Sequence, residues 1–119
     1  MARVESFREL VVRRKSMTLV SRIYRTTTTW PSEERFGLTM RARRAAVSIP
    51  ATIAEGRGRS GSREMNHHGS IAHGSLSELD TRLLIGQDLG YPEATDIESL
   101  LAASNEISRM LPVMMTRMA

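Results

Sequence analysis

Three arginines alternate with glycines and serines in one short stretch, the clearest candidate for a binding site in the chain. The stretch Gly56–Arg63 reads GRGRSGSR. A glycine-rich loop that leads into a helix presents backbone N–H groups and the positive end of the helix dipole to an anion. Arg57, Arg59 and Arg63 would add charge-assisted hydrogen bonds to phosphate. The GxxxxGK[ST] pattern of a P-loop is missing, so the stretch predicts anion binding without nucleotide hydrolysis. The alternative is a solvated linker whose arginines pair with acids of the same or a neighbouring subunit.

Two further basic clusters lie upstream of this stretch. Arg41, Arg43 and Arg44 form one of them. The other consists of Arg8, Arg13, Arg14, Lys15, Arg22 and Arg25, in which residues 8, 15, 22 and 25 follow helical spacing and could form a basic stripe. Aromatic residues make up only 4% of the chain, so side chains for base stacking are scarce. Any contact with RNA or DNA is therefore expected to reach mainly the phosphates.

The charge of the chain is divided unevenly between its two halves. Residues 1–63 contain 14 of the 17 Lys and Arg and 5 of the 13 Asp and Glu, a net charge of +9. Residues 64–119 contain the other 3 basic and 8 acidic residues, a net charge of −5. This polarity favours binding of a polyanion by the first half. It equally suits a head-to-tail ring in which the basic half of one subunit meets the acidic half of the next.

Three histidines in one segment raise the question of a metal site. They are His67, His68 and His73, and Glu64 with His67 forms a single ExxH pattern. A di-iron bundle needs two such patterns and two more inward-facing carboxylates, and the sequence has no second ExxH. We therefore expect surface or subunit-interface histidines, with no metal and no cofactor.

Glu55 is the acid that stands at the end of the small-residue segment before Gly56. Its expected state is either a buried carboxylate or a helix-end carboxylate held by Arg44 or by a neighbouring backbone group. An acid without a nucleophile, a histidine partner or a metal does not make a catalytic site. We predict a protein that is not an enzyme, with no small-molecule substrate.

The elements that position these residues are predicted to be four amphipathic helices. Apolar residues recur at spacings of three and four, the pattern of helices that bury one face. The expected helices cover residues 7–27, 39–55, 63–89 and 96–117 of a single domain, 1–119. Short polar connections and the lack of a convincing strand predict an all-α fold, an antiparallel up-and-down four-helix bundle.

Several local features of this bundle can be predicted from single residues. On helix one, the expected apolar stripe consists of Phe7, Leu10, Met17, Val20 and Tyr24, joined by Leu19 and Ile23. Thr39 is the expected N-cap of helix two, and Pro50 is expected to kink that helix, with Ser48 helping to satisfy the freed backbone groups. Gly56 and Gly90 are expected left-handed C-caps. Trp30 is expected to close one end of the bundle.

Composition places further bounds on the chain. Its 119 residues suffice for one modest core. Cysteine is absent, which excludes disulfides and thiolate sites and suits a reducing cytoplasm. No apolar run approaches the roughly 20 residues that span a bilayer, and the first ten residues include acids where a signal peptide would be apolar. We expect a cytoplasmic protein with no membrane partner.

Three segments together resemble a known family. They are GLT with RRAAVSIPATIAEG (residues 37–39 and 43–56), IAHGSLSELDTRL (71–83) and TTTTWPSEERFGL (26–38). They are similar to the motifs of the four-helix-bundle family encoded in 23S rRNA intervening sequences. The resemblance implies a bundle that assembles into a homopentamer and has no established enzymatic activity. A related accessory protein of diversity-generating retroelements binds nucleic acid and a reverse transcriptase.

Two functional hypotheses follow for this chain. In the first, an oligomer binds RNA or DNA backbone through Arg41, Arg43, Arg44, Arg57, Arg59 and Arg63. A ring would multiply weak sites through effective concentration. In the second, the protein is an interaction or scaffold subunit whose basic surface serves its own ring assembly.

Overall fold

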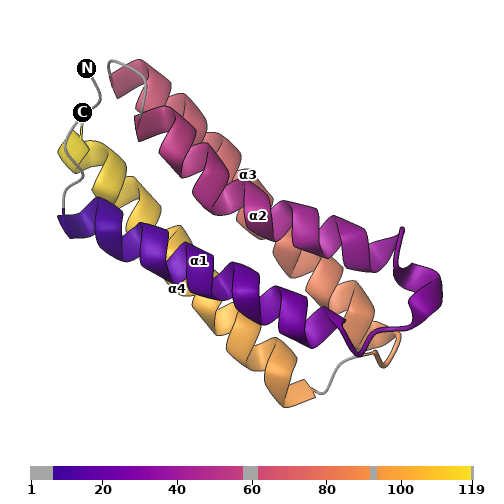
Figure 1. Ribbon diagram of the computed structural model, residues 1–119. Helices are drawn as coiled ribbons and strands as arrows, with labels where there is room; N and C mark the ends of the chain where they lie inside the picture. The colour runs from indigo at the N-terminus through magenta and orange to yellow at the C-terminus, as the bar shows by residue number, and fades with distance from the viewer. Residues whose placement is uncertain (1–6, 58–61, 92–93, 119) are drawn as a thin grey trace.

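The computed structural model describes residues 7–57, 62–91 and 94–118. It contains the helices α1 (Phe7–Thr27), α2 (Leu38–Arg57), α3 (Ser62–Asp88) and α4 (Ala94–Met118), with a short 3-10 helix, η1 (Ser32–Glu34), before α2. Consecutive helices run in opposite directions (Figure 1). The all-α four-helix bundle is confirmed, and each helix begins and ends within two residues of its predicted position. Among the described residues no helix is long and apolar enough to cross a membrane.

Each helix packs against its two neighbours around one core. The contacts join α1 to α2, α2 to α3, α3 to α4, and α4 back to α1. The largest fully buried side chains come from all four helices and are those of Leu19, Ile23, Ile49, Met65, Leu76, Leu79, Leu83, Ile97, Leu100, Ile107 and Leu111. Burial of this apolar surface is the main favourable term in folding.

The buried face of α1 matches the predicted stripe only in part, since Leu19 and Ile23 are buried as expected and Val20 packs against the core. The helix buries Glu9, Val12, Ser16, Leu19, Ile23 and Thr27. Phe7 and Met17, which were expected in the core, are 79% and 54% exposed. The sequence misleads because the true core face contains polar residues. The Ser16 hydroxyl donates to Val12 O (2.8 Å) and the Thr27 hydroxyl to Ile23 O (2.7 Å), so neither side chain is buried unsatisfied.

The first turn of α2 is capped by an acid rather than by threonine. The helix begins at Leu38, whose backbone N–H donates to Glu34 Oε1 at 3.2 Å. Thr39 lies inside the first turn, and its buried hydroxyl makes no hydrogen bond to the described residues. The predicted Thr39 cap is therefore wrong. The turn at Gly37 brings the Glu34 carboxylate back toward the free N–H groups of the helix, which favour negative charge.

Of the two predicted glycine caps, one is confirmed and one is wrong. Gly90 has a φ of +77°, and Tyr91 N–H donates to Gly86 O (3.0 Å) in the pattern of a Schellman motif. Gly56 instead lies within α2 and is buried. A Cβ placed on it would lie 2.7 Å from His68 Cβ, so this glycine permits a close approach of α2 to α3.

Proline does not end α2. The helix continues past Pro50 to Arg57. The Ser48 hydroxyl lies 2.9 Å from Ser75 Oγ on α3 and 3.4 Å from Thr52 Oγ1. The prediction that Ser48 would serve the backbone groups freed by Pro50 is therefore wrong, since its hydroxyl contacts other hydroxyls.

Trp30 closes the end of the bundle at which α2 begins and α3 ends, as predicted. Its indole is buried, contacts Gly86 of α3 and lies 5.9 Å from the Tyr91 ring, measured between centroids. The Tyr91 hydroxyl donates to Glu34 Oε2 at 2.9 Å. This hydrogen bond, together with desolvation and the charges of Glu34 and Glu33, raises the pKa of Tyr91 above 10.0. Glu34 thus joins the start of α2 to the residue that follows the α3 cap.

A partly buried carboxyl lies between α3 and α4. Burial raises the pKa of Asp80 above its ordinary value of 3.8, and the neighbouring Ser104 hydroxyl lowers it part of the way back. Ser104 Oγ itself is fully buried and makes no well-aligned hydrogen bond within the described residues. The folded state therefore keeps the Asp80 proton to a higher pH than the unfolded chain does.

The Asp80 carboxyl predicts a specific pH dependence. Because the folded protein binds the proton more tightly, the stability that Asp80 contributes is complete below pH 3.8 and is lost as the pH rises through the folded-state pKa. Asp80→Asn should be more stable than the wild type at pH 7, with a difference that disappears near pH 3. Urea unfolding at both values measures this. Glu98→Gln, on the exposed side of α4, is the control. A difference of equal size at pH 3 and pH 7 would exclude the charge as the cause.

Candidate functional site

The predicted arginines divide into two groups at opposite ends of α2. Arg41, Arg43 and Arg44 lie in its first two turns, and Arg57 is its last residue. Thirteen residues separate Arg44 from Arg57, which corresponds to about 20 Å along a helix. Arg63 is exposed in the first turn of α3, near the Arg57 end. Arg59 and the centre of the glycine-rich loop lie outside the described residues, so anion binding by that loop stays a prediction.

Arg43 joins α1 to α2. Its Nε–H donates to Thr27 Oγ1 (2.8 Å) and its Nη2 to Tyr24 O (3.2 Å). The guanidinium also lies 4.5 Å from the centroid of the Tyr24 ring, within the range of a cation–π contact. These contacts occupy much of a side chain that was predicted to bind phosphate.

Arg57 also has an acidic partner within the bundle. Its Nε lies 3.9 Å from Oε2 of Glu9, whose side chain is only 4% exposed. A buried carboxylate needs a nearby positive charge, because removing an unpaired ion from water is costly. Arg57 thus belongs in part to the internal packing of α1 and α2.

The role predicted for Glu55 is corrected by the structure. Its side chain is 65% exposed, and its Oε2 lies 3.9 Å from His68 Nε2 rather than beside Arg44. His68 is buried and its Nδ1 lies 2.8 Å from Glu64 O. Within the described residues no group of three His, Asp or Glu could hold a metal ion.

Arg41 and Arg44 line a polar pocket between α2 and α3, which we call the α2–α3 pocket. Its volume is about 360 Å³, and its lining consists of Arg41, Arg44, Ala45, Ser48, Ser75, Glu78 and Arg82. Arg82 and Glu78 form an i, i+4 ion pair (3.2 Å). Sequence reasoning missed the α3 side of this pocket. The available signal was the spacing of residues 75, 78 and 82, which puts three polar side chains on one face of a helix.

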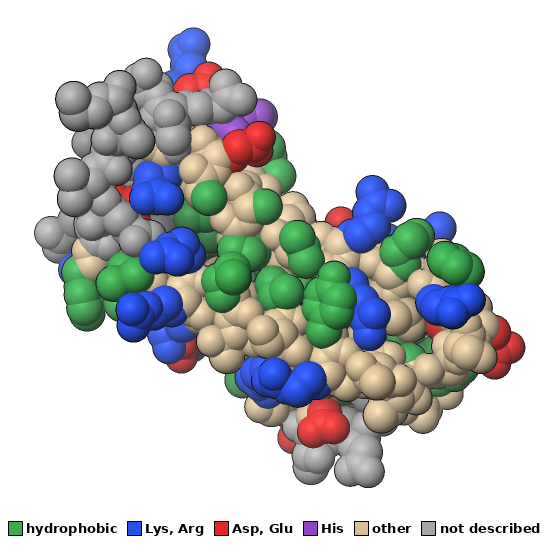
Figure 2. All heavy atoms as spheres, viewed as in Figure 1, with side chains coloured by type: hydrophobic (Ala, Val, Ile, Leu, Met, Phe, Trp, Pro, Cys, Tyr) green, Lys and Arg blue, Asp and Glu red, His purple; other side chains and the backbone are tan. Residues whose placement is uncertain are grey.

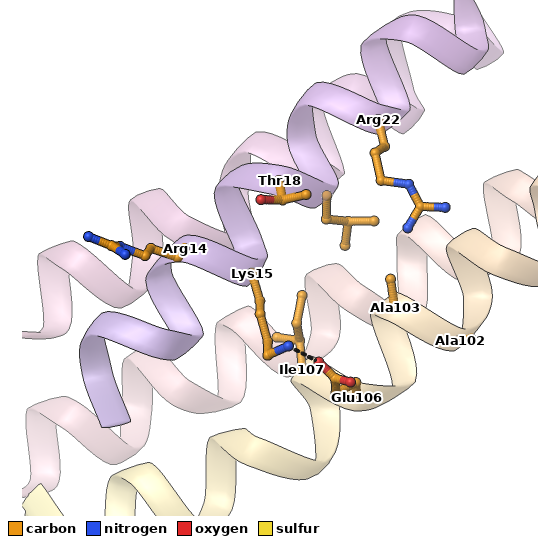
Figure 3. A pocket seen from close by; sticks show the side chains of 9 residues that line it. Arg14, Lys15, Thr18, Arg22, Ala102, Ala103, Glu106 and Ile107 are labelled. Atoms are coloured by element: carbon orange, nitrogen blue, oxygen red, sulfur yellow. Dashed lines mark ion pairs between the residues drawn. The ribbon is translucent and has the colours of Figure 1, made fainter. Parts of the chain in front are cut away.

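A second hollow, which we call the α1–α4 groove, has an apolar floor and a basic rim. Its volume is about 420 Å³, and Leu19 and Ile107 lie at its base. Lys15 pairs with Glu106 across the groove (2.5 Å), and Arg22 reaches toward α4 and donates to Ser99 Oγ (2.6 Å) (Figure 3). Two members of the predicted helix-one stripe therefore bind α4.

The ion pair across the α1–α4 groove also changes the acidity of its carboxylate. A hydrogen bond from Lys15, strengthened by the lysine charge, lowers the pKa of Glu106. Arg14 lines the same groove and is exposed, at its edge (Figure 3). Three bases of α1 thus line one groove, and two of them contact α4.

The charge asymmetry of the sequence becomes an asymmetry between the two sides of the bundle. The neighbouring helices α1 and α2 together contain ten Lys and Arg against two Glu, a net charge of +8. The helices α3 and α4 together contain four Arg against seven Asp and Glu, a net charge of −3. Figure 2 shows Lys and Arg side chains spread over the face that α1 and α2 present, around a central group of hydrophobic side chains.

Hydrophobic side chains are exposed on the same two helices. They include Phe7, Met17 and Tyr24 of α1 and Val47 of α2, each more than two-fifths exposed. On α3, Ile71, Leu84 and Ile85 are exposed as well. Exposed apolar residues are typical of surfaces that contact another protein, and here they occur on both sides of the bundle.

The comparisons with known proteins agree with this bundle. Residues 8–112 match the model of a family described as 23S rRNA-intervening sequence protein. The chain belongs to this family. The bundle is also similar to a solved structure of a protein with unknown function from the S23 ribosomal protein family of Bacteroides thetaiotaomicron VPI-5482. The two chains are 22% identical, with a TM-score of 0.84, over 92% of this chain and 99% of the other. No curated protein matches the chain.

The segment that carries the family resemblance has clear structural roles in this bundle. Arg43 joins α2 to α1, Ser48 contacts Ser75 of α3, and Gly56 lets His68 approach. Arg44 is the exception, since it is exposed and lines the α2–α3 pocket. The segment therefore builds the bundle and contributes one side of a hollow that could receive a ligand.

Proposed function

We propose that this protein binds the phosphate backbone of RNA or DNA as a homo-oligomer, through the basic surface of α1 and α2. The observation that carries the proposal is the net charge of +8 on these two adjacent helices. Surfaces of this kind attract polyanions through release of condensed counterions. The family resemblance adds a ring of five subunits, which would repeat the surface and raise its avidity.

The exposed arginines Arg41 and Arg44 are the best phosphate ligands on this surface. In the part of the chain that the structure describes, neither takes part in an ion pair with an acid. Arg43 and Arg57 contribute mainly charge, because their guanidiniums also contact Thr27 and Glu9. Arg63, exposed in the first turn of α3, would add to this surface. Arg59 lies outside the described residues and is included for its charge alone. Binding of this kind needs no catalytic group. The absence of cysteine is compatible with the reducing environment of the cytoplasm, where we propose that the protein acts.

A scaffold role is the second candidate, and the exposed side chains of Phe7, Met17 and Tyr24 favour it. In that case the basic helices of one subunit would meet the acidic α3 and α4 of the next. The two candidates predict different effects of removing surface arginines. In the scaffold role the oligomer should become smaller, whereas in the nucleic-acid-binding role binding should weaken and the oligomer should stay the same.

Fluorescence anisotropy with labelled RNA and DNA, single-stranded and duplex, tests the proposal at several salt concentrations. Nuclease-treated wild-type protein should bind with a log–log salt slope of about −3 or steeper, since each phosphate contact contributes about −0.9. The double variant Arg41→Gln/Arg44→Gln should make the slope shallower by about 2 units. Light scattering should show an unchanged oligomer.

Arg35→Gln is the matched control, because Arg35 is exposed and stacks over Phe36 outside α1 and α2. It should leave the salt slope unchanged. An absence of binding at about 50 mM salt, where the electrostatic attraction is strong, would contradict the proposal. A smaller oligomer in the double variant, together with no binding by the wild type, would favour the scaffold role.

A further inference from the structure

The α2–α3 pocket is built from two matching helical faces. Arg41, Arg44 and Ser48 lie at positions i, i+3 and i+7 of α2, and Ser75, Glu78 and Arg82 have the same spacing on α3. Residues at such spacings share one face of a helix. The Oγ atoms of Ser48 and Ser75 are 2.9 Å apart and fix the register of the two antiparallel helices. In this register Arg44 lies opposite the Glu78 turn, and Arg41 lies opposite Arg82.

This arrangement leaves an excess of positive charge in one hollow. Three guanidiniums line the pocket, and Glu78 is its only acid. The Glu78 carboxylate accepts from Arg82 Nη2 at 3.2 Å and neutralises one of the three charges. A net charge of +2 remains. Arg41 and Arg44 are exposed and Arg82 is half-buried. Like charges gathered around one hollow repel each other, and a bound anion would relieve this repulsion.

The pocket also has hydrogen-bond donors without a protein acceptor. The Nε atom of Arg82 is buried and has no hydrogen-bond partner in the described part of the chain. Each serine hydroxyl has one hydrogen to donate. Since Ser48 and Ser75 share one hydrogen bond, the second hydroxyl hydrogen is left for Thr52 Oγ1 at 3.4 Å or for a ligand. A planar guanidinium and a hydroxyl together match the oxygens of a tetrahedral oxyanion.

We propose that the α2–α3 pocket is a binding site for a phosphate group, held by Arg41, Arg44 and Arg82 and oriented by the hydroxyls of Ser48 and Ser75. The phosphate can come from a nucleic-acid backbone, in which case the site rests on the proposed function and defines its main contact. It can equally be free phosphate or a phosphomonoester, in which case the site stands without nucleic-acid binding. A volume of about 360 Å³ lies within the usual range of ligand pockets.

Titration with inorganic phosphate at constant ionic strength, with chloride as the balancing anion, tests the site. Phosphate should raise the Tm of the full-length protein, and isothermal titration calorimetry should show saturable binding. Arg82→Gln should weaken this binding about tenfold or more, the usual effect of losing a hydrogen bond to a charged group. Ser48→Ala should also weaken it, and provides a second variant if Arg82→Gln does not fold. Arg35→Gln, which alters an exposed arginine outside the pocket, should bind like the wild type.

A competition experiment identifies the source of the phosphate. If a short single-stranded oligonucleotide displaces inorganic phosphate and binds more weakly to Arg82→Gln, the pocket holds the nucleic-acid backbone. If phosphate binds and the oligonucleotide does not compete, the pocket binds free phosphate or a phosphomonoester. In that case the pocket is a phosphate site even if the protein does not bind nucleic acid. The inference is overturned if phosphate has no more effect than chloride. It is also overturned if folded Arg82→Gln and Ser48→Ala both bind phosphate as the wild type does, even where the oligonucleotide binds well.

Discussion

Trp30→Ala is expected to lower the free energy of unfolding by about 3–5 kcal/mol, the usual cost of removing a large buried aromatic side chain. Trp30 is 5% exposed and fills the space between Gly86 and the Tyr91 ring. Alanine would leave a cavity at the point where two interhelical connections meet. For a chain of this size the loss corresponds to a decrease in Tm of roughly 10–20 °C. Urea unfolding followed by circular dichroism measures it.

Trp30→Phe tests how much of this stability depends on the full size of the indole ring. Trp30 Nε1 makes no hydrogen bond to the described residues, so phenylalanine loses no polar contact. It keeps an aromatic ring beside Tyr91, and its cost should be well below that of alanine. If both variants were equally destabilised, the end of the bundle would depend on the full area of the indole. If neither were destabilised, the closure by Trp30 would contribute nothing to stability.

The fold was predictable because helical spacing dominates the chain. The four helices and the role of Trp30 follow from periodicity and from breaker residues, which act locally. The buried face of α1 was not predictable in this way. That helix has an exposed apolar stripe, which includes Phe7 and Met17, beside a core face that contains Ser16. The hydrophobic pattern includes Leu19 and Ile23 of the core face but cannot identify the buried hydroxyls, which helix-internal hydrogen bonds make acceptable.

The candidate site was predictable only on one side. The arginines of α2 stand out in the sequence, but Arg82 does not, because it becomes their neighbour only through the antiparallel register of α2 and α3. Local patterns also overestimated the availability of Arg43 and Arg57 for phosphate, because their partners Tyr24 and Glu9 are distant in sequence. Spacing identifies which residues share a helical face. Pairing between faces depends on how the helices pack.

The close approach of α2 to α3 at Gly56 predicts different effects for the same substitution at two glycines. Gly56→Ala would place a Cβ 2.7 Å from His68 Cβ and 3.1 Å from its Cγ, atoms that lie near the backbone and cannot rotate away. Gly74 lies in α3 with nothing within 4 Å of a Cβ. Both changes gain about 1 kcal/mol of helix propensity. Only Gly56→Ala adds the cost of overpacking, typically about 1–3 kcal/mol.

Gly74→Ala should therefore be more stable than the wild type, and Gly56→Ala less stable than Gly74→Ala by about 1–3 kcal/mol. Part of the helix-propensity gain cancels in this difference, although Gly56 is the penultimate residue of α2 and Gly74 lies inside α3. The larger part of the difference measures the packing of α2 against His68. Urea unfolding of the two variants side by side gives the value. Equal stabilities would mean that the helices can separate at Gly56 without cost. Because the α2–α3 pocket lies between the same two helices, a contact that accommodates the added methyl group without cost should also leave phosphate binding unchanged in Gly56→Ala.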